Sequence, residues 1–158
     1  MIEEKIRLLL GYEPKSGDLV WLTSYGRKRP GMIAGVLDRQ GYIRIRINGK
    51  TLMGHRIAWL LSYGRWPDGQ IDHKNLRKSD NRLCNLREVG ENNFLQRGNQ
   101  RVRKDSRSKL KGVTFLPRGT FTARIGNKHL GTFSTAQAAH AVYVVEARKL
   151  YGKFARVR

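Results

Sequence analysis

The chain of 158 residues carries 32 Lys and Arg against 12 Asp and Glu, a formal net charge of +20 at pH 7. This charge favours a polyanionic partner, and nucleic acid is preferred to a membrane because no segment approaches the ~20 apolar residues of a spanning helix. The first residues also lack the layout of a secretory signal. A single cysteine, Cys84, excludes an internal disulfide and a cysteine-based zinc site, and it indicates a reducing, cytoplasmic compartment.

The first part of the chain predicts one short helix followed by strands. Apolar residues with helical spacing indicate a helix over residues 1–11. Strands are predicted at 19–22, 33–36 and 41–50. In the last of these, isoleucines alternate with arginines, so one face enters the core and the other is cationic, and an Asn-Gly turn ends the strand.

A second helix and a short strand are expected next. Helical spacing over residues 55–63 is followed by Gly64, a natural helix end. Residues 70–73 form a strand-like entry into a polar loop over 74–81. A further helix is expected to begin near Glu91.

Residues 96–110 differ in composition from everything before them. This segment is rich in Arg and Lys and has almost no apolar residue. It is therefore expected to be a basic linker that is flexible until it meets phosphate. It separates two predicted domains, residues 1–95 and residues 111–158.

The C-terminal part predicts a small sheet packed on one helix. Three strands are expected, at 112–115, 120–125 and 128–133, with turns between them. An amphipathic helix capped by Ser134 or Thr135 follows. The expected buried face of this helix consists of Ala138, Ala139, Val142, Val145 and Ala147.

The residues with the clearest chemical indication lie between positions 71 and 97. Asp72 stands beside His73, and two asparagines follow, Asn85 and Asn93. A carboxylate and an amide oxygen are hard ligands that suit Mg²⁺, which fills its other positions with water and phosphate. An imidazole that is neutral near pH 7 can take a proton from an attacking water. These groups on a strand, loop and helix are what a single-metal nuclease needs.

Residues 19–97 resemble the HNH homing endonucleases of bacteriophages and introns, in the zinc-free group whose last His is replaced by Asn. The resemblance rests on the segments GHRIAWLLSYGRWPDGQ, IDH and DNRLCNLREV in this order. It implies an α+β fold with a ββα-metal motif and one Mg²⁺ or Mn²⁺ per active site. Asp72 and Asn93 would then bind the metal, and His73 would be the general base. Asn85 would brace the loop and keep His73 oriented.

Several residues near this motif have alternative interpretations. The chain has Leu76-Arg77 where family members often carry Gly-Asn. The stretch after Val89 is one residue shorter than usual, which leaves Asn92 as a rival to Asn93. We prefer Asn93 because its spacing to Arg97 matches the family's Asn-x-x-x-Arg pattern.

The remaining candidates have mostly structural interpretations. Asn81 is a second candidate for bracing the loop. His55 is a candidate for a phosphate contact or for supporting the active-site loop, with a structural role at a helix N-terminus as an equal alternative. We expect His129 and His140 to be structural, and Cys84 to be a small buried hydrophobic residue.

Residues 111–158 resemble the ethylene-responsive-factor type of DNA-binding domain, which is also found appended to phage HNH proteins. The matching segments are Lys111-Gly112-Val113, residues 121–125, residues 130–133 and residues 135–139. The resemblance implies a three-stranded antiparallel sheet on one helix, and such a sheet can enter the major groove. Period-two alternation directs Phe121, Ala123 and Ile125 to the helix and Thr122 and Arg124 to the opposite face.

The sequence as a whole predicts a metal-dependent, homing-type DNA endonuclease of a phage-infected or bacterial cell. Its partner is double-stranded DNA, with no small-molecule cofactor, and it is a monomer or weak dimer. The residues expected to touch DNA are Arg44, Arg46, His55, Arg97, Arg101, Arg103, Lys111, Arg118, Arg124 and Lys128, with Thr114 a weaker choice. One alternative is a non-catalytic DNA- or RNA-binding regulator on an eroded nuclease scaffold. A structural protein that binds an acidic partner is a more distant one.

Overall fold

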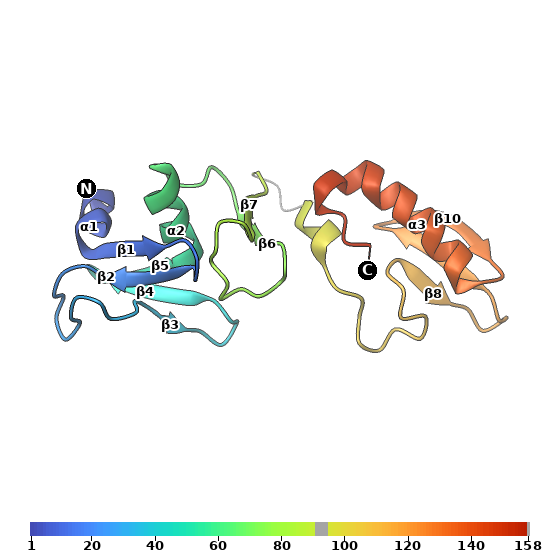
Figure 1. Ribbon diagram of the computed structural model, residues 1–158. Coiled ribbons are helices and arrows are strands. Elements are labelled where there is room, and N and C mark those ends of the chain that lie inside the picture. The colour runs from blue at the N-terminus through green and yellow to red at the C-terminus, as the bar shows by residue number, and fades with distance from the viewer. Residues whose placement is uncertain (91–94, 158) are drawn as a thin grey trace. The chain divides into compact units, whose positions relative to one another are not determined.

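The structure is a computed structural model that describes residues 1–90 and 95–157 (Figure 1). The chain divides into two compact units, residues 1–92 and residues 93–158. The helix expected from Glu91 begins outside the described residues. Where the chain is described, no helix is both long enough and apolar enough to cross a membrane.

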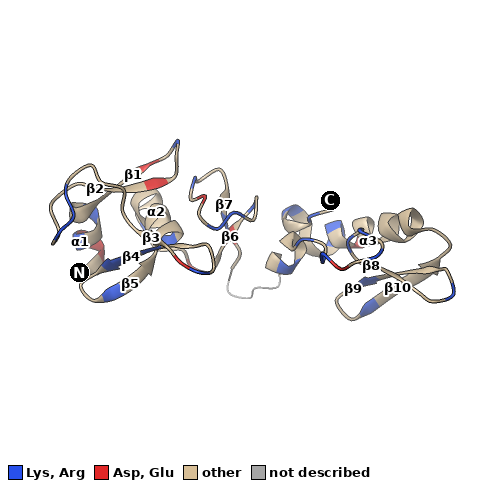
Figure 2. Cartoon of the chain, turned by 90° about the horizontal axis from the view of Figure 1, so that it is seen from below, with Lys and Arg blue, Asp and Glu red and all other residues tan. Residues whose placement is uncertain are grey.

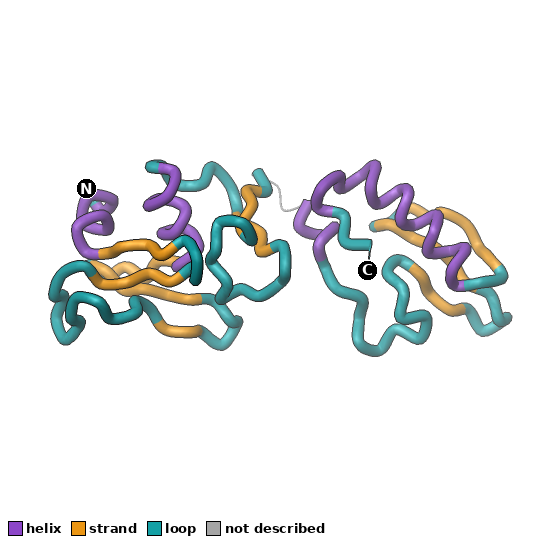
Figure 3. Tube along the Cα trace, in the orientation of Figure 1, coloured by secondary structure: helices purple, strands orange, loops and turns teal. Residues whose placement is uncertain are grey.

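The first unit combines helices with small antiparallel sheets. Its elements are α1 (Ile2–Leu9), β1 (Leu10–Glu13), β2 (Asp18–Trp21), β3 (Val36–Leu37), β4 (Ile43–Ile47), β5 (Lys50–Met53), α2 (Gly54–Tyr63), β6 (Ile71–His73) and β7 (Leu86–Glu88). The strands are ordered β1-β2, β3-β4-β5 and β6-β7. Figure 3 distinguishes these helices and strands by colour.

The core of the first unit forms because its helices and sheets each bury one apolar face. Ile6 of α1, Ile45 and Ile47 of β4, and Ile57 and Leu60 of α2 are at most 2% exposed. Burying a side chain of this size contributes roughly 1.5–3 kcal/mol. The helix predicted over 55–63 is confirmed, and so is the entry of the β4 isoleucines into the core.

Two glycine positions fix how these elements end. Asn48 and Gly49 have φ of 49° and 76°, the backbone that a tight two-residue hairpin needs, and they join β4 to β5 as predicted. Gly64 has φ of 75° and its N–H donates to the carbonyl of Leu60, which ends α2.

Two predictions for the first part of the chain are wrong in detail. The helix expected over 1–11 ends at Leu9, because the residues from Leu10 onward pair with β2 as strand β1. The strand expected at 33–36 is replaced by the two-residue β3, while Ile33 makes a single bridge to Val20.

The second unit is a three-stranded sheet with one long helix. Its elements are the 3₁₀ helix η1 (Leu95–Asn99), β8 (Val113–Phe115), β9 (Phe121–Ile125), β10 (Lys128–Phe133), α3 (Ala136–Tyr151) and the 3₁₀ helix η2 (Gly152–Phe154). The antiparallel order is β10-β9-β8, so β9 is central. The three predicted strands and the predicted helix are present, and the expected α+β class is confirmed.

The helix α3 begins as predicted but buries a different face. The Thr135 hydroxyl accepts a hydrogen bond from the N–H of Ala138 at 3.2 Å and caps the first turn. The buried residues are Ala139, Tyr143, Ala147 and Tyr151. Ala138 and Val145, expected on this face, are exposed, because a face of alternating alanine and tyrosine with a spacing of four packs on the sheet instead.

The central strand β9 follows the predicted alternation except at one residue. Ala123 and Ile125 are buried, and Ala123 packs with Ala139 of α3, while Arg124 is exposed. Thr122 was expected on the exposed face but is buried. Its hydroxyl donates to the carbonyl of Gly131 at 3.3 Å, which satisfies the buried polar group.

Several residues of the basic segment 96–110 are packed within the second unit. Gly98 and Asn99 of η1 are buried, and the N–H of Arg156 donates to the carbonyl of Gly98 at 2.8 Å. The hydroxyl of Ser108 donates to the carbonyl of Val113 at 2.8 Å. Direct hydrogen bonds therefore hold both ends of this segment against the unit.

Candidate active site

The hairpin of β6 and β7 carries the acid-histidine pair and is held against α2. In its antiparallel register, Asp72 pairs with Arg87. Ile71 and Leu86 pack against the ring of Trp59 on α2. The hairpin therefore has a fixed position in the first unit, next to α2.

Asn85 ties together the two sides of the loop between β6 and β7. Its side-chain carbonyl accepts a hydrogen bond from the N–H of Asn75 at 2.9 Å. Its side-chain amide donates to the carbonyl of Asp80 at 2.8 Å. Because the Asn85 side chain is buried, these bonds are shielded from competing water.

Asp80 is a second crosslink in the same loop, one to which the sequence had given no role. The amide of Asn75 and the guanidinium of Arg82 donate to its carboxylate, at 2.7 Å and 2.8 Å. The hydrogen bond from Arg82 lowers the pKa of Asp80 to about 2. The hydroxyl of Tyr12 on β1 adds a third tie, donating to the carbonyl of Asn81 and accepting from the N–H of Leu83.

His73 lies buried among aromatic rings and one amide. Its ring centroid is 5.2 Å from that of His55 and 6.1 Å from that of Tyr42. The carbonyl oxygen of the Asn81 side chain lies 3.3 Å from Nε2 of His73, so with this amide orientation Nε2 carries the proton and Nδ1 the lone pair. Burial lowers the pKa of His73 below its ordinary value, which favours the neutral ring at pH 7.

His55 lies in the first turn of α2 and is buried behind His73. Burial, aided by the nearby His73 and Arg56, lowers the pKa of His55 to about 3. Its Nδ1 is one of the buried side-chain atoms for which the described residues provide no hydrogen-bond partner. Because His55 is only 7% exposed, its burial favours a role in supporting His73 rather than in contacting a phosphate.

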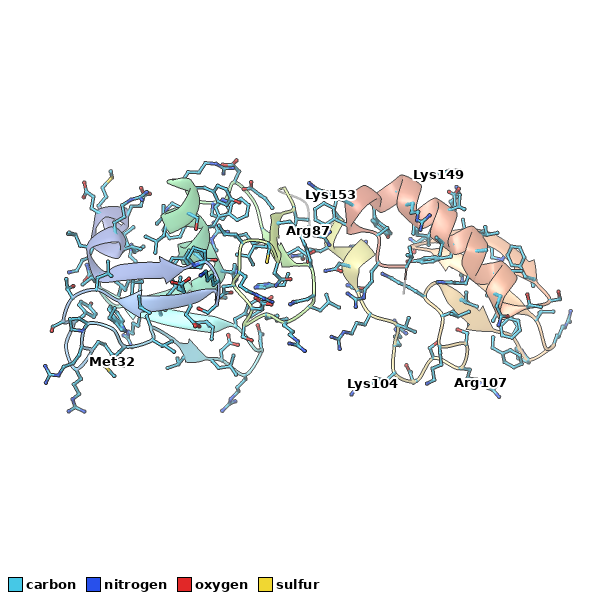
Figure 4. All side chains as sticks on the ribbon, viewed as in Figure 1. Met32, Arg87, Lys104, Arg107, Lys149 and Lys153 are labelled. Carbon is cyan, nitrogen blue, oxygen red and sulfur yellow. The ribbon has the colours of Figure 1, made fainter. Side chains whose placement is uncertain are left out.

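Asp72 forms a buried ion pair with Arg87, which Figure 4 labels on β7. A guanidinium nitrogen of Arg87 lies 2.7 Å from a carboxylate oxygen of Asp72, and the two side chains are 12% and 9% exposed. The sequence contained no signal for this partner, because the register of a hairpin with a long loop is not set by its turn residues. Arg87 supplies a counter-charge for the carboxylate.

The described residues supply only some of the ligands that a hard divalent cation would need at this site. The Asp72 carboxylate is the type of oxygen donor that Mg²⁺ and Mn²⁺ take. Asn93 and its rival Asn92 lie outside the described residues. Within residues 1–90 and 95–157, no group of three or more His, Cys, Asp and Glu side chains could hold a metal ion.

The two arginines predicted on β4 differ in their availability to DNA. Arg44 is half-buried and its guanidinium donates to the carboxylate of Asp38. Arg46 is exposed, and Figure 2 shows the Lys and Arg positions of β4 in blue. Arg46 therefore remains open to a phosphate, whereas Arg44 already neutralises a carboxylate.

In the second unit, most of the predicted DNA-contact residues surround one cavity of about 460 Å³. Its polar lining includes Arg101, Arg103, Arg107, Lys111, Thr114 and Arg124. Arg107, labelled in Figure 4, was not singled out from the sequence, and its guanidinium stands 4.9 Å from the ring centroid of Phe115. The structure thus brings the basic segment and the sheet together around a cationic hollow.

Lys111 contributes less free charge to this hollow than the arginines do. Its ammonium donates to the carbonyl of Gly98 at 2.6 Å. Burial, with the nearby Arg156, lowers its pKa to about 8. Its hydrogen bond holds η1 near β8, which is a structural role.

The other predicted contacts of the second unit lie elsewhere on it. Arg97 and Lys128 line a different cavity, of about 500 Å³, and Lys128 forms a 3.3 Å ion pair with Glu146. Arg118 is exposed in the turn between β8 and β9. These three residues are therefore not gathered with Arg124.

Cys84, His140 and His129 were predicted from the sequence to have structural roles. Cys84 is exposed, which corrects the prediction of a buried residue: its loop lies at the surface, and its carbonyl accepts from Lys74. His140 has its ring nitrogens 3.0 Å and 3.2 Å from the carbonyls of Lys111 and Val157, which fits a structural residue. His129 is exposed on β10.

Comparison with known proteins identifies one segment. Residues 53–92 match a family model described as HNH endonuclease. No curated protein and no solved structure matches the chain significantly. The matched segment includes α2, β6 and β7, so residues 53–92 are similar to the HNH endonucleases in the part of the chain that carries Asp72 and His73, as the resemblance of residues 19–97 implied. The resemblance of residues 111–158 and the phage origin remain predictions.

Proposed function

We propose that this protein is a metal-dependent, homing-type endonuclease that hydrolyses phosphodiester bonds in double-stranded DNA. The observation that carries the proposal is the buried Asp72-His73 pair on β6, inside the segment that matches the HNH endonucleases. DNA is also the polyanion that best suits the net charge of +20.

His73 acts as the general base in this proposal. The Asn81 carbonyl beside Nε2 favours the tautomer with its proton on Nε2, so Nδ1 is the ring nitrogen that would accept a proton from the attacking water. Burial supports this role because it favours the neutral ring at pH 7. Asn85 acts indirectly, by bracing the loop that carries Asn81.

Asp72 and Asn93 would hold one Mg²⁺ or Mn²⁺ in this site. When bound, the ion supplies positive charge beside the scissile phosphate and the leaving 3′-oxygen. Cleavage would leave a 5′-phosphate and a 3′-hydroxyl. Both ions accept oxygen ligands, so either metal satisfies the proposal.

The second unit binds the DNA duplex in this proposal. Its support is the exposed Arg124 on the central strand β9 and the cationic hollow beside it. Contacts with phosphates would release counterions, and Arg124 could donate to guanine in the major groove. We further propose that the protein is a monomer or weak dimer that works in the cytoplasm of a bacterial or phage-infected cell.

The His73→Ala variant tests the chemical role directly. We expect metal-dependent nicking of supercoiled plasmid to fall by roughly 10²–10⁴-fold, the usual contribution of a general base. Affinity for the same plasmid in a gel shift should be unchanged. His129→Ala, which removes an exposed histidine of β10, is the matched control and should cut at the wild-type rate. A His73→Ala rate within twofold of wild type would contradict the assignment.

A non-catalytic DNA- or RNA-binding regulator is the second candidate, and one observation favours it. The Asp72 carboxylate already has a buried counter-charge in Arg87, so it satisfies its charge without a metal. A protein of this kind would shift plasmid in a gel but leave it supercoiled in both Mg²⁺ and Mn²⁺. Nicking that EDTA abolishes would exclude this candidate.

A further inference from the structure

Four apolar side chains of the first unit are exposed to solvent. They lie far from the β6-β7 hairpin in the sequence, and the proposed chemistry does not use them. Met32, Ile33, Val36 and Leu37 are 48%, 68%, 68% and 64% exposed. Met32 is labelled in Figure 4, in the chain that leads to β3. We call these four residues the apolar ridge. They lie within six consecutive residues, and neighbouring exposed apolar side chains mark a binding surface more often than single ones do.

The backbone beneath the apolar ridge is rigidly held. The N–H of Trp21 donates to the carbonyl of Met32 at 2.9 Å, and the N–H of Ala34 donates to the carbonyl of Leu19 at 2.6 Å. Ala34 itself is buried, and β3 pairs with β4. The ridge is thus fixed to both sheets of the core, so its side chains are exposed by the fold rather than by a loose loop.

A close approach of the backbone strengthens this anchorage. Gly35 has φ of 104°, and a Cβ at this position would lie 2.6 Å from a methyl carbon of Ile43. Only glycine allows the chain to cross so close to β4. The backbone is therefore held in place at Gly35, between Ile33 and Val36.

Cations flank the apolar ridge on both sides in the sequence. Arg27, Lys28 and Arg29 precede it, Arg39 follows it, and all four are exposed. No acidic residue occurs from Leu19 to Leu37. Asp38 is occupied by Arg44 and by the N–H groups of Gln40 and Tyr42. Over the described residues, none of the four cations forms an ion pair with a carboxylate.

We propose that the apolar ridge is a wedge that inserts between base pairs from the minor groove of DNA and bends the duplex. Proteins that bend DNA from this groove insert Leu, Ile, Met or similar side chains between base steps, and basic residues hold the phosphates alongside. Apolar side chains framed by unpaired cations match both requirements. The inference rests on the proposed DNA substrate but not on the cleavage chemistry.

Charge argues for DNA as the occupant of the ridge. A second copy of this chain would bring the same four cations against these four, and like charges at such a surface repel. The edge strand β3 offers only two residues for pairing with another sheet. A duplex, by contrast, places phosphates on both sides of an apolar base stack.

The test measures unwinding of plasmid, because side chains inserted between base pairs unwind the duplex at any sequence. Relaxed closed-circular plasmid is incubated with saturating protein and a metal-independent topoisomerase in EDTA, so that proposed metal-dependent nicking cannot interfere. We expect the wild-type protein to change the linking number of the plasmid. The variant Ile33→Ser with Val36→Ser should at least halve this change at equal occupancy, which a gel shift verifies.

The control is Leu8→Ser, which removes an apolar side chain that is 70% exposed on α1, outside the ridge. It should unwind plasmid as the wild type does. An unchanged linking number with wild-type protein, or equal unwinding by the ridge variant, overturns the proposal. The proposal is also overturned if the ridge variant unwinds plasmid normally and instead loses binding to anionic vesicles or loses self-association. A protein that unwinds plasmid but nicks it in neither Mg²⁺ nor Mn²⁺ retains the wedge and refutes the nuclease.

Discussion

At the scale of single residues, the site depends on a histidine kept neutral by its surroundings. A general base near neutral pH must be unprotonated and must present one nitrogen consistently. His73 meets the first condition through burial and the second through the Asn81 amide. His55 reinforces both, since a neutral ring packed 5.2 Å away adds no charge and limits rotation of His73.

The low pKa of His55 predicts how stability changes with pH. Its folded pKa of about 3 lies below the unfolded value of 6.5, so only the unfolded chain binds a proton between these values. The contribution of neutral His55 to the free energy of unfolding is therefore fully present above pH 6.5 and is lost as the pH falls toward 3. Between pH 7 and pH 5, His55 alone should lower the free energy of unfolding by about 2 kcal/mol.

The measurement compares wild type with His55→Phe, which keeps an aromatic ring without a titrating nitrogen. All three tryptophans, Trp21, Trp59 and Trp66, lie in the first unit, so their fluorescence in urea reports on this unit alone. The variant should lose less stability than wild type between pH 7 and pH 5. Equal losses would show that His55 is not the responsible group.

At the scale of elements, the strands and helices near the site follow from local patterns, but their crosslinks do not. The helical spacing of residues 55–63 and the IDH strand entry predict α2 and β6, because each depends on neighbours in the sequence. The hydrogen bonds from Tyr12 reach Asn81 and Leu83, about seventy positions away. Such contacts follow from the packing of β1 against the loop, which no local pattern encodes.

The same reasoning explains why part of the site was predictable and part was not. Asp72, His73 and Asn85 were recognisable because their residue types and spacing belong to one short motif. Arg87 became visible only with the β6-β7 register, which a twelve-residue loop leaves open in the sequence. The β1 strand was missed because the helical spacing of α1 continues to Leu10, where strand pairing prevails.

The loop between β6 and β7 should depend on Asn85 for its order. Asn85→Ala leaves the N–H of Asn75 and the carbonyl of Asp80 without their partner, at a cost of roughly 2–4 kcal/mol. We expect faster amide hydrogen exchange in residues 74–85 and slower nicking. Asn85→Asp is the matched variant, because it retains the acceptor for Asn75 and replaces the donor to Asp80 with a second acceptor oxygen. If both variants exchange at the wild-type rate, the loop does not rely on this side chain.

At the scale of the whole molecule, the surplus of positive charge is largely uncompensated. Ion pairs within the described residues occupy seven of the twelve carboxylates, those of Glu4, Asp38, Asp68, Asp72, Asp80, Glu88 and Glu146. Each pair neutralises an arginine, a lysine or, for Glu4, the N-terminal ammonium, so the pairs create no acidic surface. Both units therefore attract phosphate, and salt should weaken DNA binding strongly.

The salt dependence of binding shows which cations meet the DNA. A variant of the second unit replaces Arg101, Arg103, Arg107 and Arg124, which line one cavity, with Ala. If all four touch phosphates, the slope of log K against log salt should become shallower by about 3–4, at about 0.9 per contact. The control replaces four other exposed cations, Lys15, Lys50, Arg148 and Lys149, and so has the same net charge. Fluorescence anisotropy of a labelled duplex between low and physiological salt measures both slopes. Equal slopes for the two variants would mean that net charge, rather than the face around Arg124, governs binding.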